Sequence, residues 1–215
     1  MADKNVDYIV EEVMKRVSKR FQITVEASGR HLHLTREGIN ILFGVDYKLT
    51  KVKELSQPGQ FGCGERVSLI GPKGTIKNVV ILGPERSKIQ VEISKSDANI
   101  LGISAPIRES GKLEGSAGIT IATEKTSLTI EEGLIIAKRH IHLSPQDAKL
   151  FKVRDKDIVK AEVSSDRSLV FDDVVIRVNK NYASFMHIDY DEANACGFNK
   201  GITAKIINSY IKEVI

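Results

Sequence analysis

The sequence of 215 residues contains no tryptophan and only two cysteines, Cys63 and Cys196. Two cysteines make no disulfide framework, and this composition fits a reducing cytoplasm. No apolar run approaches the roughly 20 residues of a membrane span, and the first residues lack the apolar core of a secretory signal. We therefore expect a cytoplasmic protein without membrane contact.

The sequence also lacks blocks of charge of one sign. Its 32 basic and 28 acidic side chains leave a net charge of +4, and they are spread along the chain. Proteins that bind nucleic acid concentrate Lys and Arg on one face, so this distribution argues against such a partner. Hydrophobic residues make up 41% of the chain, which is enough for a packed core and too much for a disordered protein.

Residues 1–20 predict an amphipathic helix, because apolar side chains recur there at helical spacing. After this helix, short stretches rich in Val, Ile and Thr are separated by Gly and Pro. This spacing of short apolar stretches predicts barrels of short strands and not βαβ units. We also expect short helices over residues 36–43, 96–101, 145–151 and 191–196.

The chain contains an internal repeat. Residues 30–35, RHLHLT, recur as residues 139–144, RHIHLS, and residues 91–99, VEISKSDAN, match residues 186–194, MHIDYDEAN. The repeat predicts a mainly β protein with two small β-barrel domains related by approximate twofold symmetry. We expect the first barrel over residues 21–115 and the second over residues 116–215, and an exchange of strands around the junction stays open.

All five histidines of the chain fall inside this repeat. Residues i and i+2 of a strand project from the same face, so His31 and His33 can converge on one ion, and His140 and His142 can do the same. A lone His-x-His is more often a surface pair or a hydrogen-bonded pair in a polar core. Two copies in equivalent places favour metal binding, because imidazole is a ligand of zinc and similar divalent metals.

The repeat supplies a third ligand to each pair, because Glu92 and His187 occupy equivalent positions. The sequence thus predicts a first metal group of His31, His33 and Glu92, and a second metal group of His140, His142 and His187. A structural zinc is normally closed by four protein ligands, whereas a catalytic zinc keeps a position open. Three ligands in each group therefore indicate two catalytic zinc ions, or other divalent transition metals.

Two further side chains are candidates for chemistry. Arg86 follows a Gly-Pro turn, six residues before Glu92, where it is either an ordinary surface arginine or a fork for a phosphate or carboxylate beside the metals. Cys63 lies between two glycines and is either a nucleophile or a small turn residue. No histidine lies near Cys63 in the sequence to activate it, so the turn residue is favoured.

Eight motifs occur in one order over most of the chain: SGRHLHL, LSQPGQF, GPKG, LGPER, QVEIS, RESG, AKRHIHLS and DEANACGF. Together they resemble the phosphotransacylases of bacterial propanediol utilisation, also called phosphate propanoyltransferases. The resemblance implies two β-barrel domains with a dinuclear zinc site between them. It implies the reversible conversion of a short-chain acyl-CoA, propanoyl-CoA or acetyl-CoA, and phosphate to an acyl phosphate and CoA.

The resemblance also assigns roles to matching positions. It implies that the first metal group holds the zinc that meets the CoA sulfur, and that Arg86 binds phosphate. Contacts with CoA are implied for Ser28, Lys53, Leu82 and Asn194. Val80 stands where many members of the family carry an arginine, which puts one contact with a CoA phosphate in doubt.

We also expect a homodimer. In some members an N-terminal amphipathic helix directs the protein into a bacterial microcompartment. Here the predicted helix runs almost directly into the first strand. The helix is therefore either part of the packed fold or a contact with the shell or lumen of such a compartment.

Two other functions stay open. A dinuclear zinc hydrolase would cleave thioesters or phosphoesters with a metal-activated water, and phosphate-dependent formation of an acyl phosphate separates it from the transferase. A non-enzymatic shell or scaffold protein would hold structural metals and show no turnover. The shortage of fourth protein ligands argues against this last function.

Overall fold

The computed structural model describes residues 6, 8–10, 12–13 and 20–209 of the chain, so most of the helix predicted over residues 1–20 lies outside the described residues. The described elements, in chain order, are β1 (Ile23–Ala27), β2 (His31–His33), α2 (Arg36–Phe43), β3 (Lys51–Glu54), β4 (Phe61–Ile70), β5 (Thr75–Gly83), β6 (Gln90–Ile93), α3 (Lys95–Leu101), β7 (Ile107–Arg108), β8 (Ala117–Ala122), β9 (Ser127–Ala137), β10 (His140–Leu143), α4 (Pro145–Phe151), β11 (Ile158–Ser164), β12 (Leu169–Val178), β13 (Phe185–Ile188), α5 (Tyr190–Ala195) and β14 (Thr203–Ser209). None of the helices in this part of the chain has the length and apolar character needed to cross a membrane.

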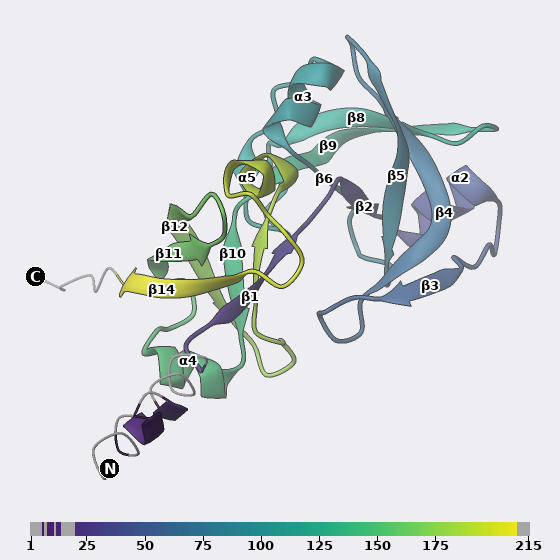
Figure 1. The fold of residues 1–215 in the computed structure, drawn as a ribbon. Coiled ribbons are helices and arrows are strands. Elements are labelled where there is room, and N and C mark those ends of the chain that lie inside the picture. The colour runs from purple at the N-terminus through teal and green to yellow at the C-terminus, as the bar shows by residue number, and fades with distance from the viewer. Residues whose placement is uncertain (1–5, 7, 11, 14–19, 210–215) are drawn as a thin grey trace, which may run out of the picture.

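Six strands close the first barrel, in the order β2-β5-β4-β8-β9-β6. Strand β3 extends this sheet beside β4, and the short β7 lies beside β9. Closure leaves no unpaired edge among the six strands. The result is a barrel that occupies one side of the molecule in Figure 1.

The second barrel is also closed by six strands, in the order β1-β13-β10-β12-β11-β14. Each strand has a counterpart in the first barrel that pairs in the same sense. Strand β2 runs parallel to β5 and antiparallel to β6, and β10 runs parallel to β12 and antiparallel to β13. The predicted fold class, a mainly β protein with two barrels related by an internal repeat, is confirmed.

The boundary expected between residues 115 and 116 does not separate the two barrels. Strand β1 comes from the N-terminal half but pairs with β13 and β14 of the second barrel. Strands β8 and β9 come from the C-terminal half but complete the first barrel. Figure 1 shows β1, in purple, among the green and yellow strands of the second barrel. The repeated units therefore exchange strands: β1 closes the second barrel between β13 and β14, and β9 closes the first between β6 and β8.

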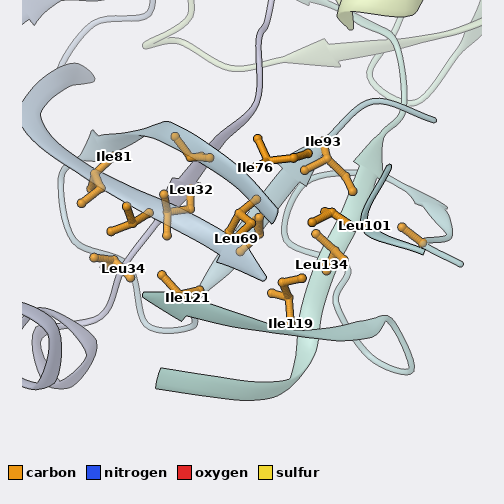
Figure 2. Close-up of a cluster of buried hydrophobic side chains, with 14 of the residues drawn as sticks. Leu32, Leu34, Leu69, Ile76, Ile81, Ile93, Leu101, Ile119, Ile121 and Leu134 are labelled. Atoms are coloured by element: carbon orange, nitrogen blue, oxygen red, sulfur yellow. The ribbon is translucent and has the colours of Figure 1, made fainter. Parts of the chain in front are cut away.

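Each barrel encloses its own hydrophobic core. Leu32, the residue between the two histidines of β2, is fully buried in the first core, as Figure 2 shows. Ile141, between the histidines of β10, is fully buried in the second core. Because side chains alternate between the two faces of a strand, burial of the central residue turns both histidines of each pair to the opposite face.

A short capped helix follows each of the four strands that carry the predicted ligands. The helix N-caps are Thr35, Ser94, Ser144 and Asp189, and each side chain accepts a hydrogen bond from a backbone N–H in the first turn. Such caps end the preceding strand at a defined residue. The helices expected over residues 36–43 and 145–151 are confirmed at those bounds, and the other two begin one residue earlier than predicted.

Candidate metal centre

Strand pairing places the third predicted ligand of each group opposite the first histidine. In the first barrel His31 on β2 is paired with Glu92 on the antiparallel β6. In the second barrel His140 on β10 is paired with His187 on the antiparallel β13. Directly opposed residues on one face lie close enough for their side chains to interact. The equivalent positions deduced from the repeat are therefore equivalent in space.

Both predicted ligand groups converge. Within each group the possible ligand atoms all lie within 4.8 Å of one another. In the first group, 3.5 Å separates His31 Nε2 from Glu92 Oε2. In the second group, the ring centroids of His140 and His142 are 4.6 Å apart, and that of His187 is 5.1 Å from His140. These spacings allow three side chains to share one cation.

Backbone carbonyl groups fix the orientation of three of the rings. The Nδ1 atoms of His31, His33 and His140 lie 2.8, 3.2 and 2.9 Å from the carbonyl oxygens of Gly29, Leu82 and Lys138. A carbonyl oxygen only accepts, so Nδ1 carries the proton and donates it. The lone pair of Nε2 is then left for a metal ion, which is the usual arrangement around a ligating histidine.

The second group contains buried nitrogen atoms without a hydrogen-bond partner. Within the described part of the chain, both ring nitrogens of His142 and Nε2 of His187 have none. Buried polar atoms are nearly always paired, so an unpaired cluster calls for an explanation, and a bound ion is one. The donor set of imidazoles and one carboxylate is also the chemistry that zinc prefers. The residues present therefore fit a divalent transition metal.

Burial keeps four of the imidazoles in the form that binds metals. It lowers the pKa of His33 and His142 to about 2 and that of His187 to about 3. Burial also lowers the pKa of His140, although a hydrogen bond to the Lys138 carbonyl acts in the opposite direction. Neutral imidazole is the metal-binding form, so the rings are ready to bind at neutral pH.

The two groups face one cavity of about 770 Å³. Arg86 lines the same cavity, as do three of the four residues expected to contact CoA: Ser28, Lys53 and Leu82. Val80 also lies in its wall. The fourth expected residue, Asn194, is exposed on α5, outside the cavity lining. The structure thus brings the predicted residues together with the exception of Asn194.

A buried glutamine connects Arg86 to the first metal group. The Nε2 atom of Gln90 donates to Glu92 Oε1 (2.5 Å) and to Ser110 Oγ (2.7 Å), and its Oε1 accepts from Gly111 N (2.8 Å). Ser110 Oγ also accepts from Arg86 Nη1, at 3.3 Å. Burial lowers the pKa of Arg86, so an anion bound beside the guanidinium would stabilise its charged form.

Arg177 and Tyr182 are among the cavity residues that were not predicted from the sequence. Arg177 lies on β12, paired in parallel register with His142, and it lines the cavity. Extending the repeat to β5 and β12 places it at the position of Leu82, a signal that the sequence did contain. Tyr182 packs its ring on His142, with 4.1 Å between centroids, and it lies in a loop that the repeat does not align.

Cys63 is buried and does not line the cavity. Burial raises the pKa of its thiol to about 11. A protonated, enclosed thiol is a poor nucleophile. Cys63 lies inside strand β4 and packs in the first core, so the turn position favoured from the sequence is wrong, because the flanking glycines belong to a strand.

Comparisons with known proteins give one family. The family model described as phosphate propanoyltransferase matches residues 24–199. A phosphate propanoyltransferase of Clostridioides difficile (strain 630) is 59% identical over 199 residues, which cover 93% of this chain and 95% of that protein. A phosphate propanoyltransferase of Enterococcus faecalis (strain ATCC 700802 / V583) is 56% identical over 94% of this chain and 97% of that protein. A phosphate propanoyltransferase of Thermotoga maritima is 50% identical over 96% of this chain and 99% of that protein.

Proposed function

The chain belongs to the phosphate propanoyltransferase family and is a phosphate acyltransferase, and we propose that it acts at a dinuclear zinc site. The substrates are phosphate and a short-chain acyl-CoA, propanoyl-CoA or acetyl-CoA, and the products are the acyl phosphate and CoA. One observation carries this proposal: two convergent groups of possible metal ligands and a half-buried arginine line the same cavity.

The residues of the first and second metal groups would hold the two cations. When bound, the cations supply Lewis-acid stabilisation of the negative charge that develops on the thioester oxygen and on the leaving sulfur. Zinc is the metal that best matches the imidazole and carboxylate donors.

Arg86 binds and orients the phosphate in this proposal. Its guanidinium presents two parallel N–H donors to two oxygens of one anion, and Ser110 restrains it on one side. A phosphate oxygen held in this way attacks the thioester carbonyl carbon, the carbon–sulfur bond breaks, and CoA leaves with the electron pair of that bond. Fixing the phosphate lowers the entropic cost of the encounter.

The transfer proceeds directly, without an acyl-enzyme. Cys63, the nucleophile considered in the sequence, is buried outside the cavity lining. The attacking group is therefore the phosphate itself. The attacking group distinguishes the transferase from a hydrolase, in which water attacks the same carbonyl carbon.

The proposed function is tested by assaying the purified chain with acetyl-, propanoyl- and butanoyl-CoA, each with and without phosphate. We expect acyl phosphate, trapped as its hydroxamate, to form only with phosphate. Chelation should abolish turnover, and Zn²⁺ should restore it. Release of free acid without phosphate would instead indicate a thioester hydrolase, and turnover that survives complete metal removal would contradict the dinuclear site.

Arg86→Ala should lower kcat/KM for phosphate by roughly 100-fold, the loss typical for one removed charge-stabilising donor. Metal content should not change, because Arg86 is not a ligand. The matched control is Arg36→Ala, which removes an exposed arginine paired with Glu85. Phosphate kinetics of Arg86→Ala that equal those of the wild type would exclude the assigned role.

Two parts of the proposal concern the assembly. We propose a homodimer and, as in some members of the family, a contact of residues 1–20 with a bacterial microcompartment. The protein would then act in the cytoplasm, either free or inside such a compartment. Light scattering of the purified full chain tests the dimer, since a monomer at assay concentration would exclude it.

A further inference from the structure

His187 differs from the three histidines whose rings are held by backbone carbonyl groups. Its Nδ1 atom lies 3.8 Å from Glu26 Oε2, and within the described residues no carbonyl accepts from this ring. Glu26 is on β1, paired with His187 in the parallel register of β1 and β13. The second metal group therefore has an acidic neighbour beside His187, where His31, His33 and His140 have a backbone oxygen.

The internal repeat gives this neighbour a counterpart. Strand β9 occupies in the first barrel the place that β1 has in the second, and there Ile135 is paired with Glu92. The chain thus sets a carboxylate beside the histidine ligand and an isoleucine beside the carboxylate ligand. A carboxylate at residue 135 would repel Glu92, whereas a carboxylate beside His187 attracts a ring that becomes more positive on binding a cation.

Counting Glu26 also makes the negative charge of the two metal groups equal. The three ligands of the first group include one carboxylate, and those of the second include none. Glu26, which lines the same cavity, gives the second group one carboxylate as well. Each divalent cation would then have one negative side chain close to it.

A residue of the other barrel holds Glu26 in place. Ser56, in the loop between β3 and β4, donates its hydroxyl hydrogen to Glu26 Oε2 at 2.5 Å. The next residue, Gln57, also reaches across, because its Nε2 donates to the Ala183 carbonyl oxygen at 3.0 Å. The loop that carries Ser56 therefore fixes the carboxylate from the opposite side of the cavity.

We propose that Glu26 is a positioning residue of the second metal group, which stabilises the proton on Nδ1 of His187 and so presents Nε2 to the cation. The distance of 3.8 Å exceeds a hydrogen bond, so Glu26 acts through its charge. A carboxylate behind a ligating histidine fixes the tautomer and raises the basicity of the ligand. This inference rests on the metal centre of the proposed function and adds to it a residue outside the six ligands.

The test is titration of the metal-free protein with Co²⁺, followed by absorbance and calorimetry. We expect Glu26→Gln to weaken one of two binding sites by 10- to 100-fold, the usual effect of removing such a partner, and to leave the other unchanged. Ser56→Ala should weaken the same site less. The control is Glu162→Gln, the same change at an exposed glutamate on β11 of the same barrel. This variant should bind both ions with wild-type affinity.

A second variant, in which the first metal group is disabled, shows which of the two sites Glu26→Gln weakens. His33→Ala removes a ligand of the first group, so the remaining site belongs to the second, and Glu26→Gln should weaken it by the same factor. Thermal unfolding of the metal-free variants checks that they are folded. If Glu26→Gln does not fold, Ser56→Ala is used in its place to test the role of Glu26. Wild-type affinities in Glu26→Gln would overturn the role of Glu26 and leave the proposed function intact. A wild-type chain that binds no Co²⁺ or Zn²⁺ would refute the metal centre together with this inference.

Discussion

A buried imidazole that stays neutral is the common property of the two metal groups. Burial lowers the pKa of His33 and His142 to about 2 and of His187 to about 3. The unfolded chain has no such environment, so its histidines titrate near 6.5. The same desolvation that prepares these rings for a cation therefore makes the metal-free fold sensitive to acid.

The free energy of unfolding of the metal-free protein should fall as the pH is lowered below about 6.5. There the unfolded chain binds protons at these three positions and the folded chain does not until about pH 2–3, so each contributes a loss of up to about 1.4 kcal/mol per pH unit. Urea unfolding between pH 7.5 and 5 measures this dependence above the range of most carboxylates. His142→Asn should reduce the slope by about one proton, and a free energy that is constant over this range would contradict the burial of the rings.

At the scale of the element, a very short strand is enough to supply two of the three residues of each metal group. Strand β2 has three residues, and its geometry alone turns His31 and His33 to one face and Leu32 to the other. The core that holds Leu32 therefore also determines where the two imidazoles point. Its equivalent in β10, Ile141, does the same in the second barrel.

Leu32→Ala should lower the free energy of unfolding by about 2–5 kcal/mol, because the site is fully buried and the cavity left behind adds to the lost transfer energy. Val170→Ala, on an exposed position of β12, should change it by no more than about 0.5 kcal/mol. Urea denaturation measures both. A loss below about 1 kcal/mol for Leu32→Ala would show that this strand is not anchored by its central side chain.

For the whole molecule, the exchange of strands ties the two barrels together. Strand β1 completes the second barrel, whereas the next strand in the chain, β2, belongs to the first. A destabilising substitution in β1 should therefore weaken the second barrel, although most of that barrel comes from the C-terminal half of the chain. The cavity between the metal groups depends on both barrels and on this crossing of the chain.

Val25→Asp places a charge in the buried core of the second barrel and should cost at least about 3 kcal/mol, the penalty of an uncompensated buried charge. Hydrogen exchange should show lost protection in β10–β14 before β2–β6. Thr24→Asp is the matched control, since Thr24 lies on the exposed face of the same strand. Protection that is lost first in β2–β6 would contradict the exchange.

The sequence by itself determined the repeat, the two pairs of histidines and the residues beside them, Glu92 and His187. The structure brings each set together as predicted, because strand periodicity is local and because duplication places equivalent residues in equivalent surroundings. The two short helices that follow the histidine strands were also predictable, since their N-caps, Thr35 and Ser144, are adjacent in the chain to the elements they begin.

Only the tertiary structure decided which barrel β1 joins, that Asn194 lies outside the cavity lining, and that Tyr182 and Glu26 lie in it. These features depend on pairing between strands far apart in the chain, which hydrophobic periodicity does not encode. Glu26 is separated from His187 by most of the sequence and meets it only through the register of β1 and β13. Local geometry set the ligands in pairs, and long-range strand pairing supplied the residues around them.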